Sequence, residues 1–369
     1  MKICHITTVH PRYDIRIFWK ECISAARAGN EVILIVNDGM DDEEINGVKI
    51  LSLKSKAKNR LSRIFSISVK RKAYKKAIEL KADIYHFHDP ELLGLGKKLK
   101  KQGFRVIYDS HEDTPRQILA KEWMPRFARK VVSMLFERYE NRCVRMYDAI
   151  IVPTPHLKER FSRLHNSVWE VCNFPSLEDI SYSGERYSNS NPGCYIGELT
   201  YTRGIRQIAE ATHKVGIRLN LCGVFHSKGL ERELSEKYDN IQYMGFLGRK
   251  EISRVLSTSS MGFVTLFDTP NDANSYPIKL FEYMAAGIPV VASDFPVYKE
   301  VVEGNNCGIC VDPRNIDAIC AAINKIRDNK AYADELRNNG YRAVVERYNW
   351  ESQAEVLMEC YNSVNLNPS

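Results

Sequence analysis

Residues 274–294 read NSYPIKLFEYMAAGIPVVASD, a short helix followed at once by a buried strand. Ser275 is the expected N-cap, and Pro277 suits the first helical turn. Gly287 is expected to end the helix. The apolar face of this helix comprises Ile278, Phe281, Met284 and Ala285. A helix that leads into an apolar strand is the repeating unit of a parallel α/β sheet.

The same alternation of strands and helices extends in both directions from this stretch. Before it, apolar runs occupy residues 2–8, 31–37, 82–88, 105–111, 148–154, 194–199, 218–224, 241–247 and 261–267. After it, another run occupies residues 308–313. Helical patterns lie between the runs, at 16–29, 203–216 and 249–259. The pattern predicts doubly wound parallel sheets, which bind ligands beyond the carboxyl ends of their strands.

The length of 369 residues favours two domains over one core. Residues 174–193 are polar and rich in Ser, Asn and Pro, and are interpreted as a linker. We therefore predict an N-terminal Rossmann-like domain over 1–175, a second over 176–349, and a cleft between them. The helical stretch near 350–369 has no strand after it and is a candidate to pack back on the first domain.

Composition and cysteine usage narrow the class of protein. Hydrophobic residues make up 44% and charged residues 27% of the chain, which is typical of a globular protein. No apolar run is long enough for a membrane span, and the first residues lack a signal-peptide core, so a cytoplasmic location is expected. The CGIC sequence at 307–310 is interpreted as a turn glycine entering a strand rather than as a zinc site.

Charge is divided unevenly between the halves. Residues 1–175 hold 33 Lys and Arg against 21 Asp and Glu, a surplus of 12. The surplus is densest at 54–81, where eleven basic residues accompany one acid. Leu61, Ile64 and Phe65 lie at helical spacing among them. This segment is either a solvated helix face or a surface attracted to anionic lipid. Nucleic acid is not expected as a partner, because no recognised nucleic-acid module is visible.

Three polar residues near two expected helix starts are candidates for chemistry. The start of the 278–285 helix is a potential anion site beside Lys279, and Glu282 could accept the hydroxyls of a ribose. Arg203 begins another helix, where it could bind a phosphate. Each of the three is equally compatible with an ordinary surface position. The sequence has no GxxxxGK[ST] phosphate loop and no DxD pair, so no metal clamp for a diphosphate is predicted.

Histidines follow two expected strands of the first half. HFHD at 86–89 places two histidines on one strand face, and YDSHED at 108–113 places His111 after the next strand. One histidine with adjacent carboxylates on an extended strand is a poor ligand set for a metal. His111 is therefore interpreted as a positioned hydrogen-bonding or acid–base group, with a capped loop histidine as the alternative.

Taken in order, YDSHED, YIGELTYTRG (195–204), IQYMGFLGRKE (241–251) and YPIKLFEYMAAGIPVVASD (276–294) resemble the retaining nucleotide-sugar glycosyltransferases of family four, with the GT-B fold. HPRYDIRIF (10–18) and HFHDPELL (86–93) resemble a subgroup that assembles bacterial surface polysaccharides such as O-antigen, lipopolysaccharide and capsule. The resemblance spans nearly the whole chain. It implies two facing Rossmann-like domains, with the donor held mainly by the second.

The resemblance also implies roles for individual residues. Glu282 would hold the ribose, Arg203 would neutralise the diphosphate, and His111 would lie near the transferred sugar and the acceptor. Catalytic candidates are thus His111 and Glu282. The donor-binding candidates are Gly197, Arg203, Leu247, Asn274, Ser275, Tyr276, Ile278, Lys279 and Glu282. The acceptor-side candidates are His10, Arg12, Asp14, Arg16, His88 and Glu112.

Two positions depart from the family pattern. Asn274 replaces the glutamate that contacts the donor sugar, and Glu198 stands where a second phosphate-binding arginine is common. The implied reaction moves a hexosyl or N-acetylhexosaminyl group from a UDP-sugar, or as second choice a GDP-sugar, to a glycan acceptor, with a lipid-linked glycan as the favoured acceptor. No metal cofactor is expected, and the enzyme would act peripherally at the inner membrane. The alternatives are a GT-B nucleotide-sugar epimerase or hydrolase, and a basic non-catalytic lipid- or nucleic-acid-binding protein.

Overall fold

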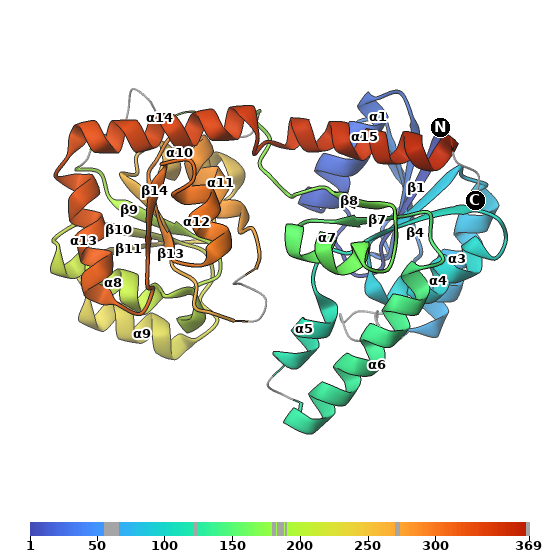
Figure 1. The fold of residues 1–369 in the computed structure, drawn as a ribbon, viewed down its shortest axis with the longest axis horizontal. Helices are drawn as coiled ribbons and strands as arrows, with labels where there is room; N and C mark the ends of the chain where they lie inside the picture. The colour runs from blue at the N-terminus through green and yellow to red at the C-terminus, as the bar shows by residue number, and fades with distance from the viewer. Residues whose placement is uncertain are drawn as a thin grey trace. The chain divides into compact units, whose positions relative to one another are not determined.

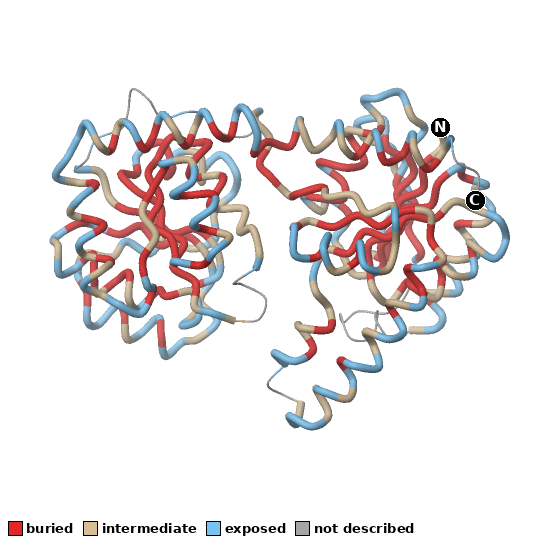
Figure 2. The backbone as a smooth tube through the Cα atoms, viewed as in Figure 1, coloured by how far each residue is buried: buried red, intermediate tan, exposed pale blue. Residues whose placement is uncertain are grey.

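The computed structural model describes residues 1–54, 66–121, 124–178, 182, 188, 190–269 and 274–366. The chain forms two compact units. One comprises Met1–Asn173 together with Ser352–Ser369, and the other comprises Phe174–Glu351. In each unit, helices flank a central sheet, and the buried residues concentrate along its strands (Figures 1 and 2). The prediction of two α/β domains with parallel sheets is confirmed.

The first unit is built on an eight-stranded sheet of order β3-β4-β2-β1-β5-β6-β7-β8. Every neighbouring pair is parallel except β3 and β4. The central strands are almost continuously apolar because helices cover both faces. The strands are β1 (Lys2–Ile6), β2 (Glu31–Val36), β3 (Glu43–Ile45), β4 (Val48–Ser52), β5 (Ile84–Phe87), β6 (Arg105–Asp109), β7 (Ala149–Val152) and β8 (Val168–Glu170).

Short and long helices connect these strands. They are η1 (Ile15–Cys22), α1 (Ile23–Arg27), α3 (Ile67–Leu80), η2 (Pro90–Leu92), α4 (Leu93–Lys100), α5 (Thr114–Leu119), α6 (Arg126–Val144) and α7 (Pro155–Ser162). The basic segment 54–81 contributes α3, whereas Leu61, Ile64 and Phe65 lie outside the described residues.

The predicted helix over 16–29 differs from the observed structure at its start. Residues Ile15–Cys22 form a π-helix, η1, and only Ile23–Arg27 are α-helical. In a π-helix, residues five apart lie on the same face. Arg16 and Glu21 therefore both point inward, and both are buried. The apolar periodicity of the sequence did not reveal this, because the buried pair is charged.

The second unit contains a six-stranded, entirely parallel sheet of order β11-β10-β9-β12-β13-β14. Its strands are β9 (Gly193–Ile196), β10 (Leu219–Cys222), β11 (Ile241–Gly245), β12 (Met261–Val264), β13 (Val290–Ser293) and β14 (Gly308–Val311). Its helices are η3 (Tyr201–Arg203), α8 (Ile205–Lys214), α9 (Lys228–Lys237), α10 (Arg249–Ser257), α11 (Ile278–Ala285), α12 (Pro296–Val302), α13 (Ile316–Arg327) and α14 (Lys330–Glu346).

The predicted linker and the last helix both lie near the boundary between the two units. Phe174, at the start of the predicted linker, is buried against Phe281 with ring centroids 4.6 Å apart, so the linker prediction is wrong at that end. Residues 179–181, 183–187 and 189 of that segment lie outside the described residues. The last helix, α15 (Trp350–Leu366), is part of the first unit from Ser352 onward. Its Tyr361 is fully buried there.

Candidate active site

The N-cap of helix α11 lies two residues later in the chain than expected. Pro277 occupies the N-cap position with extended backbone angles, and no side chain caps the helix, so the prediction for Ser275 is wrong. A proline can adopt this position readily, since its own amide cannot donate a hydrogen bond. Gly287 follows the C-cap with φ of +65°, as predicted. Asn274 is exposed, whereas Ser275 and Tyr276 are half-buried.

Tyr283 fixes α11 against the sheet. Its side chain is fully buried, and its hydroxyl accepts a hydrogen bond of 3.0 Å from the backbone N–H of Ile196. A Cβ at Gly262 would lie 2.3 Å from the Tyr283 ring, so only glycine leaves room for this packing. The anchored helix holds Lys279 and Glu282 in half-buried positions. The Nζ atom of Lys279 lies 3.8 Å from the centroid of the Tyr195 ring.

Two glycines bring the chain very close together beyond β9 and β10. Gly197 has φ of +129° and Gly223 has φ of +147°, angles that side chains other than glycine rarely adopt. A Cβ on Gly223 would lie 1.8 Å from the carbonyl oxygen of Gly197. A Cβ on Gly197 would lie 3.0 Å from Lys279 Nζ. The lysine ammonium is therefore held directly beside bare backbone at the carboxyl ends of these strands.

Arg203 lies between β9 and α8, at the end of η3. Its guanidinium is 4.0 Å from the carboxylate of Glu198, which also lies 3.7 Å from His226. The substitution of an acid at position 198 thus places a negative charge next to the predicted phosphate-binding arginine. Leu247 follows β11 and is half-buried. The donor-side candidates therefore follow β9, β11 or β12, or lie on α11.

In the first unit, His111 is held by a carboxylate and a second histidine. Its Nε2 lies 3.0 Å from Asp109 Oδ2 and 3.2 Å from His88 Nδ1. Asp109 is fully buried, and the guanidinium of Arg16 donates to both of its oxygens at 3.1 and 3.0 Å. Burial opposes ionisation of Asp109, but the Arg16 and His111 charges prevail and its pKa is lowered. Asp109 therefore orients the half-buried His111 ring.

His10 joins this group from the loop after β1. Its ring centroid lies 4.9 Å from that of His111, and its Nδ1 lies 3.3 Å from Asp14. Its Nε2 is 3.6 Å from Asp89. Burial lowers the pKa of His10, but the hydrogen bond to Asp14 and the charge of Asp89 outweigh burial and raise it. His10 and His111 are thus adjacent imidazoles, each beside a carboxylate.

The remaining acceptor-side candidates are placed differently. Arg12 is buried and forms ion pairs with Asp38 and Glu43. Arg16 is buried under Asp109, and His88 is also buried. Glu112 is exposed. Of the six candidates, His10 and His88 lie beside the half-buried His111 ring, and Asp14 contacts His10.

Sequence reasoning missed three acids that belong to this group. Asp89 accepts hydrogen bonds from Thr7 and Thr8, and Asp109 accepts hydrogen bonds from Arg16. Glu91 accepts a hydrogen bond of 3.2 Å from the Thr8 hydroxyl, and burial, followed by the Asp89 charge, raises its pKa to about 7. The available signal was an acid close to both a strand end and a histidine. Asp89 directly follows His88, and Asp109 precedes His111 by two positions.

Comparison with known proteins agrees with this architecture. Residues 22–171 match the glycosyltransferase family 4 domain, and residues 178–343 match the glycosyl transferases group 1 domain. An uncharacterized glycosyltransferase of Methanocaldococcus jannaschii is 25% identical over 45% of this chain and 43% of its own length. The phosphatidyl-myo-inositol mannosyltransferase of Mycobacterium leprae is 23% identical over 76% of this chain and 74% of its own. The matched region thus spans less than half of the archaeal relative.

Solved structures share the fold over almost the whole chain. Sucrose-phosphate synthase from Thermosynechococcus elongatus superposes with a TM-score of 0.78 at 19% identity, covering 98% of both chains. HepE from Anabaena, in complex with UDP and glucose, superposes with a TM-score of 0.71 at 13% identity, covering 98% of this chain and 100% of its own. At these identities the likeness concerns the fold.

Proposed function

We propose that the chain is a glycosyltransferase of GT-B fold, which transfers a sugar from a nucleotide-sugar to a glycan acceptor with retention of configuration. The match of residues 22–171 to the family 4 domain and of residues 178–343 to the group 1 domain supports this proposal. A UDP-sugar is the proposed donor, supported by the UDP bound in the Anabaena neighbour. A GDP-sugar is the second choice. The role would lie in bacterial surface-polysaccharide assembly, with a hexosyl or N-acetylhexosaminyl group transferred.

The observation that carries the donor site is the position of Lys279 over bare backbone. Its Nζ lies 3.0 Å from the position that a Cβ of Gly197 would occupy. A diphosphate at this point would contact a cation, the exposed backbone of a glycine turn and the start of α11. Arg203 would supply a second cation, weakened by Glu198 at 4.0 Å. These groups would stabilise the leaving diphosphate, so that no metal is required there.

The rest of the donor is assigned to neighbouring residues. Glu282, one helical turn beyond the start of α11, would accept hydrogen bonds from the ribose hydroxyls. Leu247 would pack on the base, and the loop Asn274–Tyr276 would face the donor sugar. Because Asn274 is an amide, it would donate as well as accept a hydrogen bond, and donor-sugar preference should differ from that of relatives with a glutamate.

The acceptor site is assigned to His10, Asp14 and His111 in the first unit. Asp109 holds His111 Nε2, so the other ring nitrogen of His111 is the one available to a sugar hydroxyl. Glu112 is exposed and would contact only a larger acceptor. The donor phosphate itself would take the acceptor proton, which explains why no dedicated base is proposed.

A thermal-shift screen against UDP, GDP and their common sugar conjugates tests this proposal. A ligand at about 100 times its Kd should stabilise the protein by about 2.7 kcal/mol. Glu282→Ala should abolish that shift, whereas Glu300→Ala, an exposed acid on α12, should retain it. Retention of the full shift in Glu282→Ala would refute the assigned ribose contact.

Turnover assays separate the proposal from its alternatives. Release of UDP that requires an added glycan acceptor supports a transferase. Product formed from the donor alone would indicate an epimerase or a hydrolase. Salt-sensitive binding to lipid or nucleic acid, with no nucleotide-sugar affinity, would indicate a basic binding protein.

Within the described residues, no helix is both long and apolar enough to span a bilayer. We propose peripheral binding to anionic membranes, where a lipid-linked acceptor would lie. Support comes from α6, on which Phe127 is 79% and Leu135 55% exposed beside the exposed Arg126 and Lys130. The segment 54–81 would add charge. Failure to sediment with anionic liposomes at low salt would refute the membrane proposal.

A further inference from the structure

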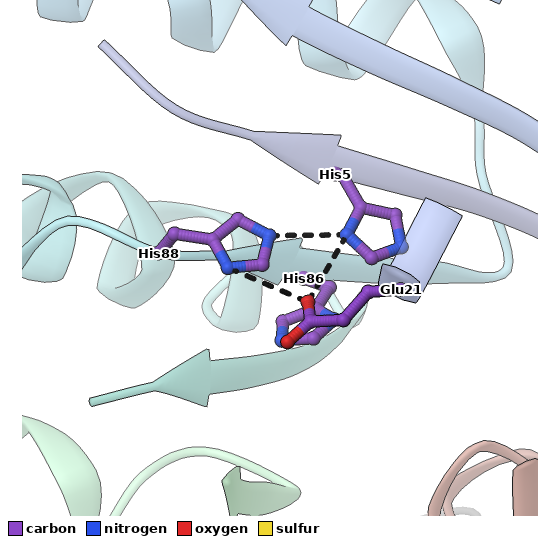
Figure 3. A group of neighbouring side chains, drawn as sticks. All are labelled: His5, Glu21, His86 and His88. Carbon is purple, nitrogen blue, oxygen red and sulfur yellow. Dashed lines mark hydrogen bonds and ion pairs between the residues drawn. The ribbon is translucent and has the colours of Figure 1, made fainter. Parts of the chain in front are cut away.

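Three histidines and one glutamate converge in the interior of the first unit. His5 lies on β1, His86 on β5, and His88 immediately after β5, while Glu21 comes from the π-helix η1. All four side chains are buried. Figure 3 shows them facing one another, and one potential ligand atom of each lies within 4.8 Å of the others.

One ring nitrogen of each histidine in this cluster already has an oxygen partner. The hydroxyl of Tyr361 lies 2.8 Å from His86 Nδ1 and 3.2 Å from His5 Nε2. His88 Nδ1 lies 3.3 Å from Asp109 Oδ2 and 3.7 Å from Glu21 Oε2. Metal-bound histidines typically use one nitrogen for the ion and the other for such an oxygen partner. The outer contacts therefore match the surroundings of a metal site.

Some of the other potential ligand atoms have no hydrogen-bond partner in the part of the chain that the structure describes. Among the described residues, His86 Nε2 and both oxygens of Glu21 make no hydrogen bond. Glu21 Oε1 does lie 2.9 Å from Arg16 Nε as an ion pair. His5 Nδ1 and His88 Nε2 lie 3.0 Å from each other. Buried polar atoms without partners are rare in proteins, and several around one point indicate a missing ligand.

Charge around the cluster favours a cation. Each of the three imidazoles has a ring nitrogen whose lone pair can bind a metal ion. The fully buried carboxyl groups of Glu21 and Asp109 share the guanidinium of Arg16, which forms an ion pair with each of them. An additional positive ion would compensate the second carboxylate.

We propose that His5, Glu21, His86 and His88 bind one Zn²⁺ ion. Three imidazoles and one carboxylate form a ligand set suited to zinc, and four protein ligands without solvent access characterise a structural site. Bonds of about 2.0–2.1 Å in a tetrahedron separate the ligand atoms by roughly 3.3 Å. The separations of 3.0 Å between His5 Nδ1 and His88 Nε2, and 4.0 Å between His5 Nδ1 and Glu21 Oε2, bracket that value.

Such an ion would tie β1, β5 and η1 together and fix His88, whose Nδ1 contacts Asp109 and His111. It would position the acceptor side without touching the donor diphosphate. The zinc proposal is therefore independent of the proposed transferase function and of the metal-free stabilisation of the leaving group.

Metal analysis of the full chain tests this proposal. The untagged protein, purified without chelators, should contain about one zinc per chain after dialysis against EDTA. After denaturation and refolding with Co²⁺ in place of zinc, it should show the strong visible absorption of tetrahedral cobalt. His86→Gln should lose the bound metal, whereas His165→Ala, a half-buried histidine elsewhere in the unit, should keep it.

Two results would overturn the proposal. The first is that the purified wild-type protein contains less than about a tenth of an equivalent of zinc, and that refolding it with ZnCl₂ adds neither bound metal nor thermal stability. The other is His86→Gln protein that retains a full equivalent. If His86→Gln fails to fold, the wild-type zinc content and cobalt spectrum decide the outcome. A metal-free wild type would mean that hydrogen bonds alone join these histidines.

Discussion

Replacing Gly223 by alanine should disrupt the donor side of the second unit. The added methyl would be placed 1.8 Å from the carbonyl oxygen of Gly197. Neither loop can move away easily, because Gly197 N donates to Cys222 O at 2.9 Å and Gly223 N donates to Gly245 O at 2.7 Å. Relief of the overlap would break one of these hydrogen bonds or bend the turn.

The size of the effect follows from two contributions. An alanine forced to a positive φ costs about 1–3 kcal/mol, and an added methylene in a tightly packed site costs about 1–3 kcal/mol more. We therefore expect the free energy of unfolding to fall by roughly 2–6 kcal/mol. Gly216→Ala is the matched control, since its φ is +70° but a Cβ there meets nothing within 4 Å. It should lose only the conformational part, about 1–2 kcal/mol.

Urea unfolding of the full chain, with and without UDP, measures both consequences. Gly223→Ala should unfold at lower urea than Gly216→Ala and should lose the stabilisation by UDP, because the turn beside Lys279 is displaced. Equal losses in the two variants would refute the reasoning, since they would show that the Gly197 and Gly223 turns separate without cost.

Two further predictions concern buried charges of the first unit. Arg16→Met should lower the free energy of unfolding by about 3–5 kcal/mol, because the buried Asp109 loses its guanidinium. Asp109→Asn added to it should restore part of the loss in urea titrations, and an unchanged midpoint in Arg16→Met would contradict the pairing. The second prediction concerns Glu91, whose pKa rises from 4.5 to about 7 on folding. Between pH 4.5 and pH 7 the folded state therefore binds more protons than the unfolded state, and the free energy of unfolding falls as the pH rises through this range. Glu91→Gln should remove about 2–3 kcal/mol of that decline between pH 5 and pH 8, and an identical decline in both proteins would exclude Glu91 as its source.

Much of the fold could be read from local patterns. Runs such as EVILIVN became the buried strand β2 because strands covered on both faces must be apolar throughout. Gly287 ended α11 because only glycine adopts its φ without strain. The end of α11 was predicted better than its start. The start depends on the extended backbone of Pro277 rather than on a capping side chain, and the sequence offered Ser275 as a reasonable competitor.

The chemistry-bearing residues were only partly predictable. Sequence alone determined that histidines and acids follow β1, β5 and β6, because strand ends are marked by the change from apolar to polar residues. It did not show that Arg16 and Glu21 point inward, since that depends on the π-helix η1. Nor did it show that Tyr361 reaches His5 and His86 from more than 270 residues away. Contacts between distant segments depend on how the sheet and helices pack, and no local pattern in the sequence records that packing.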